Sequence, residues 1–254
     1  MSSLSLSKST IENIKMVIFD KDGTLIDIHH YWCSMIEFRA DSFVDSLRLN
    51  SSDKIELYNK LVDGMGIDLD SKKMKPEGPV GIKPRGFIMN VALDIMKIYD
   101  SSYTIEMVES IFKEVDSYSQ TKLLKIVKPL PNMRQLLDDL KSAKIKISIA
   151  TTDLTNRAIL AMESLEVRDY FIDIVGADLV NNPKPKPDLV NYILHKNGLT
   201  ANEAIVVGDS IVDLEMAQNA NCRFIGVKTG LYGDEFIEKS EYLIENLKEL
   251  KVKI

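Results

Sequence analysis

Short runs of apolar residues recur along the chain, and they are most regular in its second half. The runs are Ile14–Phe19, Ile145–Ala150, Phe171–Val175, Ala204–Val207 and Phe224–Val227. Near-continuous apolar runs of this length are typical of strands that are buried on both faces of a parallel sheet. Amphipathic stretches separate the later runs, at Met133–Lys141, Thr155–Leu165, Pro187–Asn197 and Ser210–Asn219. This alternation of strand and helix predicts a doubly wound, Rossmann-like α/β fold with a mostly parallel sheet.

The segment 29–127 follows a different pattern, with helical periodicity and no apolar strand runs. Its helical stretches are Tyr31–Leu47, Ser52–Val62, Phe87–Tyr99 and Thr104–Leu124, and a loop rich in Gly, Pro and Lys is expected at Met74–Gly86. In the third stretch the apolar residues share one face, as they do in helices that pack against others. We therefore predict a helical domain over 29–127, inserted into an α/β core formed by residues 1–28 and 128–254.

Composition limits the possible classes of function. With 254 residues, 45% of them hydrophobic, the chain can bury a substantial core, and its formal net charge of −6 disfavours a nucleic-acid binder. No apolar run is long enough to span a membrane. Cys33 and Cys222 lie far apart, with no CxxC pair and no secretory signal, which favours a reducing, cytoplasmic location. No feature indicates an obligate protein partner, and the charged tail Glu238–Lys253 is expected to form a solvated amphipathic helix.

Polar side chains gather where the predicted strands end. They are Asp20 and Asp22 after the first run, Thr151 and Thr152 after the second, Lys184 in the loop beyond the third, and Asp209 and Asp213 after the fourth. Ligands of doubly wound sheets bind outside the carboxyl ends of the strands. One acidic cluster of this kind is readily explained as a helix cap, but four complementary clusters on one edge of a sheet indicate a functional site.

These residue types suit phosphoryl transfer. The transferred group carries spread negative charge, so the reaction depends on positioning and on electrostatic neutralisation. A carboxylate such as that of Asp20 can be the nucleophile if a divalent cation suppresses its repulsion with the phosphate. Mg²⁺ binds oxygen ligands, which Asp20, Asp209 and the backbone carbonyl of Asp22 are expected to supply. The hydroxyl of Thr151 and the ammonium group of Lys184 are expected to hold the remaining phosphoryl oxygens.

Four sequence motifs resemble those of the haloacid dehalogenase superfamily. Phe-Asp20-Lys-Asp22-Gly-Thr-Leu is similar to the first motif of that family, Ile-Ser-Ile-Ala-Thr151-Thr to the second, Asn-Pro-Lys184-Pro-Lys-Pro-Asp to the third and Val-Val-Gly-Asp209-Ser-Ile-Val-Asp213 to the fourth. The resemblance covers residues 12–27 and 128–232. It implies that the helical insertion is a C1-type cap, and it is strongest to the branch that holds phosphoglycolate phosphatases and β-phosphoglucomutase.

The resemblance also implies roles for individual residues. Asp20 attacks phosphorus and becomes the phosphoaspartate, and Asp22 protonates the leaving oxygen and later activates water. Two such residues converge only if the chain turns directly after the strand, which Gly23 permits and Thr24 is expected to support. Dehalogenases and P-type ATPases lack an acid at the position of Asp22, so the motif favours a phosphatase or a phosphomutase. Thr152 is expected to offer its backbone N–H to the phosphate.

Several assignments stay open from the sequence. Asp213 is compatible with three roles: an outer-sphere metal residue, a partner of Lys184, or a cap of the helix in whose first turn it lies. Lys186 competes with Lys184 for the phosphate. Arg85 is a candidate for binding a substrate anion, and it is also compatible with a solvated surface arginine. Asp153 has no explanation beyond capping the helix that follows it.

We therefore expect a Mg²⁺-dependent phosphatase that acts on a small organic phosphomonoester, such as a phosphoglycolate-like acid or a sugar phosphate. The alternative is a phosphomutase of the β-phosphoglucomutase type. Its core residues would be the same, but its cap must exclude water until the intermediate reaches a second hydroxyl. A receiver-like regulatory domain also combines acids, Thr and Lys on a parallel sheet. Such a domain carries its acid pair first and has no helical insertion.

Overall fold

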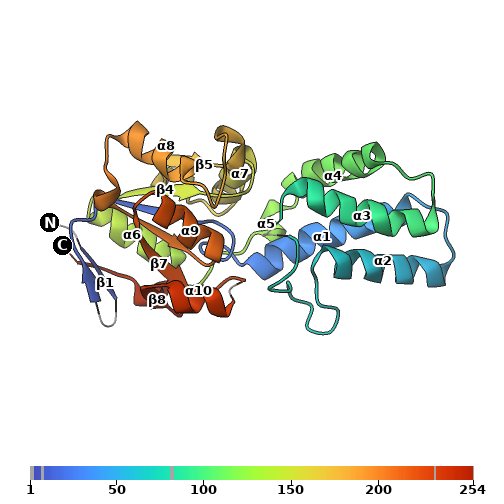
Figure 1. The fold of residues 1–254 in the computed structure, drawn as a ribbon, viewed down its shortest axis with the longest axis horizontal. Helices are drawn as coiled ribbons and strands as arrows, with labels where there is room; N and C mark the ends of the chain where they lie inside the picture. The colour runs from blue at the N-terminus through green and yellow to red at the C-terminus, as the bar shows by residue number, and fades with distance from the viewer. Residues whose placement is uncertain (1–2, 7–8, 81–82, 232, 254) are drawn as a thin grey trace. The chain divides into compact units, whose positions relative to one another are not determined.

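The computed structural model describes residues 3–6, 9–80, 83–231 and 233–253, and the chain divides into two compact units (Figure 1). One unit, Met1–Asp27 with Val127–Ile254, is an α/β domain, and the other, Ile28–Ile126, is helical. The helical unit is thus inserted directly after the first strand of the main sheet. The fold class predicted from the sequence, an α/β core with an inserted helical domain, is confirmed.

A six-stranded sheet forms the centre of the α/β unit. Its strands are β3 (Met16–Phe19), β4 (Lys146–Ala150), β5 (Asp173–Val175), β6 (Ala204–Gly208), β7 (Arg223–Val227) and β8 (Tyr242–Ile244). They lie in the order β5-β4-β3-β6-β7-β8, and every neighbouring pair is parallel. The chain extends the sheet from β3 to one side and then returns to the other side with β6. The carboxyl ends of β3 and β6 therefore flank the switch point, where ligands of doubly wound sheets bind.

The expectation of a helix over the tail Glu238–Lys253 is wrong. Helix α10 (Asp234–Lys239) ends early, and β8, a 3₁₀ turn (Leu247–Glu249) and strand β9 (Lys251–Lys253) follow it. Strand β8 pairs with β7 at the edge of the main sheet and buries Ile244. Sheet pairing and burial outweigh the helix propensity of the Glu and Lys residues in this tail.

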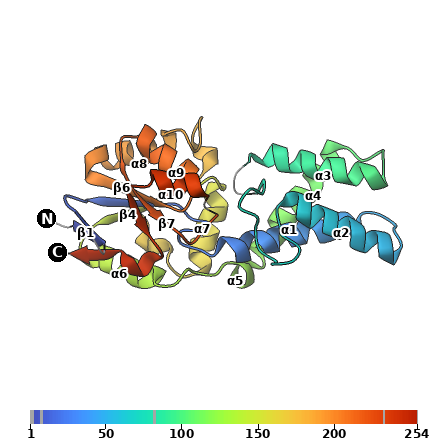
Figure 2. The ribbon, with the colours of Figure 1, turned by 60° about the horizontal axis from the view of Figure 1, so that its bottom comes forward.

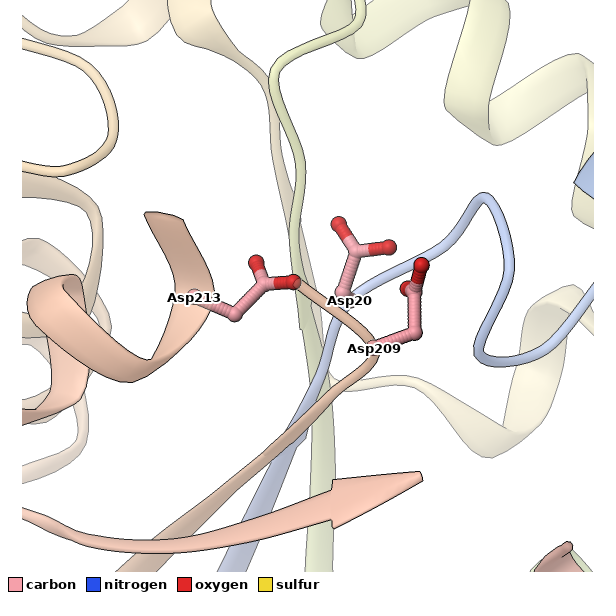
Figure 3. Close-up of side chains that lie close together, drawn as sticks. All are labelled: Asp20, Asp209 and Asp213. Carbon is pink, nitrogen blue, oxygen red and sulfur yellow. The ribbon is translucent and has the colours of Figure 1, made fainter. Parts of the chain in front are cut away.

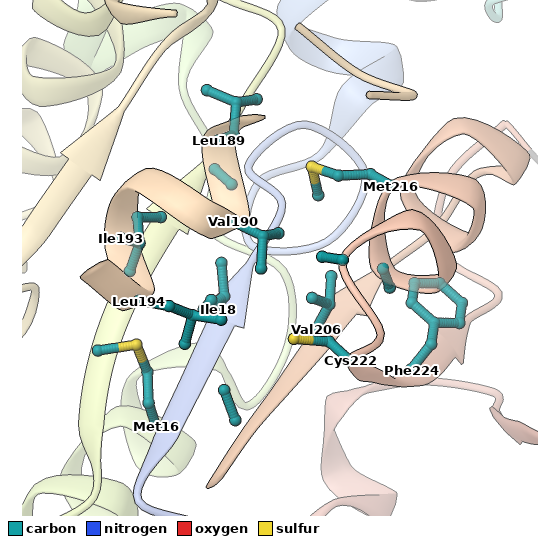
Figure 4. Packing of buried hydrophobic residues seen from close by; sticks show 14 of the residues in the cluster. Met16, Ile18, Leu189, Val190, Ile193, Leu194, Val206, Met216, Cys222 and Phe224 are labelled. Carbon is teal, nitrogen blue, oxygen red and sulfur yellow. The ribbon is translucent and has the colours of Figure 1, made fainter. Parts of the chain in front are cut away.

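Helices cover both faces of the main sheet. In Figure 2, α8 (Asp188–Asn197) and α9 (Ile211–Asn219) lie on one side of the strands and α6 (Met133–Ser142) on the other. The first two pack against Met16, Ile18 and Val206 (Figure 4). The alternate residues Val17 and Phe19 point to the opposite face, and all four residues of β3 are buried. Helix α7 (Thr155–Ser164) contacts β5. Asp20 therefore follows a strand that is packed on both faces.

The helical unit is built from four long helices, each of which packs against two others. They are α1 (Ile28–Asp45), α2 (Ser51–Met65), α3 (Arg85–Tyr99) and α4 (Ile105–Gln120), in the cyclic order α1-α2-α3-α4, and the short α5 (Leu123–Ile126) contacts α1. Side chains cap two of the helix starts: Asn50 accepts from the backbone N–H of Asp53, and Thr104 accepts from that of Met107.

Two pairings in the α/β unit join distant parts of the chain. A small antiparallel sheet, β2-β1-β9, binds the start of the chain, β1 (Ser3–Leu6) and β2 (Ser9–Ile11), to its end. The segments that lead into and out of the insertion also lie side by side. The backbone N–H of Asp27 donates to the Lys128 carbonyl at 2.9 Å, and that of Leu130 donates to the Leu25 carbonyl at 2.9 Å.

Short 3₁₀ turns connect several elements of the core, at Arg168–Tyr170, Ala177–Leu179 and Ala201–Glu203. Within the part of the chain that the structure describes, no helix combines the length and the apolar character that a membrane span requires.

Candidate active site

Asp20 stands at the carboxyl end of β3, where a tight loop begins. Its backbone N–H donates to the Val207 carbonyl of the neighbouring strand β6 at 2.8 Å, which fixes where the side chain starts. The backbone N–H groups of Leu25 and Ile26 both donate to the Lys21 carbonyl, so the chain turns back at once. Gly23 has a φ of 92°, a conformation that favours glycine. The immediate turn expected from the sequence is present.

Three buried carboxyl groups converge beside this loop. Asp20, Asp209 at the end of β6 and Asp213 in the first turn of α9 each offer an oxygen, and these oxygens lie within 4.8 Å of one another (Figure 3). Thr24 donates to Asp209 Oδ1 at 2.8 Å and so orients this carboxyl group. The two acids that follow neighbouring strands meet because β3 and β6 are paired in register.

Lys184 is the cation that contacts this acid cluster. Its Nζ lies 2.5 Å from Asp20 Oδ1 and 2.5 Å from Asp213 Oδ1, and its side chain is buried. Burial alone would lower the pKa of Lys184, but the charges of Asp20 and Asp213 outweigh burial and raise it. The competing Lys186 is exposed. Of the two lysines in this loop, the structure brings Lys184 to Asp20.

Asp213 combines two of the three roles that the sequence left open. Its Oδ1 contacts Lys184, and its Oδ2 accepts from the hydroxyl of Ser210 at 2.5 Å and from the Ser210 backbone N–H at 3.2 Å. The Ser210 hydroxyl in turn accepts from the backbone N–H of Asp213, which completes a capping box at the start of α9. One carboxyl group thus caps the helix and holds the lysine.

The charges in the cluster favour a bound cation. Burial raises the pKa of Asp20 to about 7, although the charge of Lys184 opposes the shift. Burial, the charge of Asp20 and the charge of Asp213 raise the pKa of Asp209 well above its usual range. Three buried carboxylates with one ammonium group carry excess negative charge, which a divalent cation with oxygen ligands would offset. The residues present therefore fit a divalent metal.

Asp22 is oriented differently from the cluster. Its Oδ1 accepts a hydrogen bond from Lys21 Nζ at 2.7 Å, and its side chain is not among the three converging carboxyl groups. Burial raises the pKa of Asp22, and the charge of Lys21 opposes the shift. The Asp22 side chain is mostly buried, with 11% of it exposed, and it is held by the lysine.

The loop after β4 carries the predicted phosphate ligands. Thr151 is buried, its backbone N–H donates to the Val175 carbonyl, and its hydroxyl accepts from the backbone N–H of Asp153 at 3.1 Å. Thr152 is exposed. Asp153, which had no explanation beyond a helix cap, is the ion-pair partner of Lys21 at 3.2 Å.

Arg85 belongs to the helical unit, at the first residue of α3. Its Nη2 lies 2.8 Å from Asp116 Oδ2 on α4, and its guanidinium carbon lies 5.1 Å from the ring centre of Phe112. Its side chain is partly exposed. The ion pair orients the guanidinium group, and substrate binding by Arg85 stays a prediction.

Sequence reasoning missed two residues that shape the site, Thr229 and Gly230. The Thr229 hydroxyl donates to the Gly23 carbonyl at 2.6 Å and holds the loop after β3. A Cβ atom on Gly230 would lie 1.6 Å from Asp209 Oδ2. The signal was present in the sequence, because both residues follow closely after the apolar run Phe224–Val227, at a fifth strand end.

Comparison with known proteins agrees with this geometry. Residues 17–227 match the family model of haloacid dehalogenase-like hydrolases. A phosphoglycolate phosphatase of Vibrio parahaemolyticus is 24% identical over 243 residues, which are 95% of this chain and 96% of the relative. The pyrophosphatase PpaX of Bacillus velezensis is 26% identical over 152 residues, 59% of this chain and 70% of the relative.

Solved structures share the fold. A crystal structure of a predicted phosphoglycolate phosphatase from Haemophilus somnus superposes with a TM-score of 0.69 at 18% identity, covering 93% of this chain and 96% of the other. The β-phosphoglucomutase of Clostridium difficile superposes with a TM-score of 0.60 at 20% identity, covering 94% and 93%.

Proposed function

We propose that this chain, which belongs to the haloacid dehalogenase-like hydrolases, hydrolyses a small organic phosphomonoester through an aspartyl-phosphate on Asp20. The observation that carries the proposal is the buried group of Asp20, Asp209 and Asp213 with Lys184 bridging two of them, at the switch point of the sheet. The predicted nucleophile, the cation and the metal-ligand acids lie within one site, as phosphoryl transfer requires.

The reaction has two steps. Asp20 attacks phosphorus, the bond from phosphorus to the leaving oxygen breaks, and Asp22 gives its proton to that oxygen, so the alcohol departs. Asp22 then takes a proton from water, the water oxygen attacks the phosphorus of the phosphoaspartate, and inorganic phosphate leaves with Asp20 restored. Lys184, the hydroxyl of Thr151 and the backbone N–H of Thr152 hold the phosphoryl oxygens during both steps.

Mg²⁺ is the metal that we assign to this site. Asp20, Asp209 and the backbone carbonyl of Asp22 would hold it. Asp213, in the first turn of α9, would support these ligands. When bound, it would neutralise charge on the phosphoryl group and reduce its repulsion with the nucleophile.

The substrate class that we propose is a small phosphomonoester, either a phosphoglycolate-like acid or a sugar phosphate. Relatives named phosphoglycolate phosphatase along almost the full chain support the first. We propose that the helical insertion, predicted over 29–127, acts as a cap that selects the substrate, with Arg85 as a candidate for binding a second anionic group. The excess of acidic residues supports a small molecule over a nucleic acid as the partner.

A panel of phosphorylated metabolites distinguishes hydrolysis from the mutase alternative. We expect release of inorganic phosphate from one or a few small phosphomonoesters, dependent on Mg²⁺, because Asp22 is available to activate water. Phosphate release and the appearance of isomers are followed together, by a colorimetric assay and by ³¹P NMR. If an isomer of the substrate phosphomonoester forms faster than free phosphate is released, the proposed phosphatase activity is contradicted and the phosphomutase alternative is supported.

Metal removal is expected to lower the melting temperature more at pH 8 than at pH 6. Burial raises the pKa of Asp20 from 3.8 to about 7. A carboxyl group with a raised folded-state pKa loses stability as pH rises from its unfolded value through its folded value, because the fold must then keep a buried charge. A bound cation offsets that charge, so its benefit grows over this range.

The measurement is thermal unfolding with Mg²⁺ and with EDTA at both pH values. Asp209→Asn serves as the control, because it removes a predicted ligand and should abolish most of the Mg²⁺ effect. An equal effect of Mg²⁺ at pH 6 and pH 8, or a full effect in the control, would contradict this assignment of the metal site.

A further inference from the structure

Asp22 is one end of a series of contacting charged side chains, and the other members of the series are buried. Lys21 is fully buried, and its Nζ lies 2.7 Å from Asp22 Oδ1 and 3.2 Å from Asp153 Oδ2. On the far side, Asp153 Oδ1 lies 3.5 Å from Arg157 Nη1. Acids and bases alternate along this series and balance in charge. Of its four members, only Asp22 takes part in the reaction described above.

This series joins two loops of the site. Lys21 and Asp22 belong to the loop after β3, whereas Asp153 belongs to the loop after the neighbouring strand β4. Asp153 also donates its backbone N–H to the hydroxyl of Thr151 at 3.1 Å, and its Oδ1 accepts from the backbone N–H of Leu154 at 2.8 Å. The predicted acid–base residue and the predicted phosphate ligand are thereby held in one connected network.

Stability is a weak explanation for a lysine at this position. Taking an ammonium group and carboxylates out of water carries a large desolvation penalty, and replacing a buried ion pair by apolar side chains is often neutral or stabilising. Apolar side chains at positions 21 and 153 together would fill the same buried space without that penalty. An apolar side chain at position 21 can make neither the hydrogen bond to Asp22 Oδ1 nor the ion pair with Asp153 Oδ2.

We propose that Lys21 and Asp153 are positioning residues, which hold the carboxyl group of Asp22 in the orientation that proton transfer requires. Lys21 engages Oδ1, which leaves Oδ2 to exchange the proton with the leaving oxygen and with water. Asp153, held by Arg157 and by its own loop, fixes the ammonium group of Lys21. The inference rests on the proposed function, because it assigns Lys21 to the acid–base step of that reaction.

Substrates with different leaving groups test this role. In an alkyl phosphate the leaving oxygen needs a proton, so Lys21→Met is expected to lower kcat by about 10²-fold while KM changes by less than about threefold. In 2,4-dinitrophenyl phosphate the phenolate leaves without a proton, and only hydrolysis of the phosphoaspartate is slowed. Release of dinitrophenolate should then show a burst of about one equivalent per enzyme, followed by a slow steady rate.

A second variant covers the case in which Lys21→Met does not fold. The double variant Lys21→Met, Asp153→Asn removes both members of the ion pair. It therefore leaves no buried carboxylate at position 153 opposite an uncharged side chain. This double variant should show the same burst. Lys15→Met is the matched control. Lys15 precedes the same strand at its other end, pairs with Glu203 at 2.6 Å and is exposed, so kcat should be unchanged.

A double-mutant comparison asks whether Lys21 acts through Asp22. If it does, Lys21→Met should change kcat by less than about twofold when added to Asp22→Asn. Equal losses with both substrates and no burst, or full additivity with Asp22→Asn, would overturn the inference. Failure of the proposed function looks different, because Asp22→Asn itself would then show neither a burst nor a covalent phosphoenzyme.

Discussion

Asp20→Asn is expected to abolish turnover, with a fall in kcat of about 10⁴-fold or more. The amide has nearly the shape of the carboxyl group but is not a nucleophile towards phosphorus, so the first step cannot begin. The measurement is Mg²⁺-dependent phosphate release from the best substrate of the metabolite panel, together with a search for covalently bound phosphate after acid quenching.

The fold of the Asp20→Asn variant should survive, because Lys184 keeps Asp213 as its second partner at 2.5 Å. Circular dichroism and thermal unfolding check this point. Turnover within tenfold of the wild-type rate would remove Asp20 from the role of nucleophile, since no other acid of the cluster follows β3 directly.

Gly230→Ala is expected to damage the proposed metal site, although the residue is not one of the proposed ligands. A Cβ atom at this position would lie 1.6 Å from Asp209 Oδ2, 2.2 Å from its Cγ and 2.6 Å from its Cβ. Rotation of the Asp209 side chain cannot relieve the last contact, so the backbone after β6 or after β7 must move. A displacement of about 1 Å in such a site typically costs about 10²-fold in rate.

Mg²⁺ affinity by calorimetry and kcat report on this substitution. Gly233→Ala is the matched control, because it lies in the same segment and a Cβ atom there meets no other atom within 4 Å. The control should keep wild-type affinity and rate. Wild-type Mg²⁺ affinity in Gly230→Ala would show that Asp209 does not need its present position to bind the metal.

Local patterns in the sequence were sufficient to predict the strands at the core of the fold. Each of the five apolar runs forms a strand of the main sheet, because continuous burial on both faces requires such runs. The parallel arrangement then brings Asp20 and Asp209 to one edge, since all carboxyl ends of a parallel sheet lie on the same side. The meeting of these two acids therefore follows from sequence order together with strand direction.

The remaining features depend on contacts that local patterns do not encode. Asp153 was unexplained because its partner Lys21 lies on another strand loop, and the pairing depends on the register of β3 against β4. The effect of Gly230 depends on how closely one loop passes another, which no propensity describes. The tail residues Tyr242–Ile244 form a strand because an edge of the sheet is available to them, against the helical tendency of their neighbours.

The paired segments around Asp27 and Lys128 have a consequence for how such proteins diversify. Because the chain leaves the α/β unit and re-enters it through adjacent, hydrogen-bonded backbone, the ends of the insertion are already joined within the core. The segment between them can be exchanged, lengthened or shortened as a cassette while the register that places Asp20 is kept. Under the proposed function, the catalytic chemistry and the choice of substrate would then be inherited as separable parts of one gene.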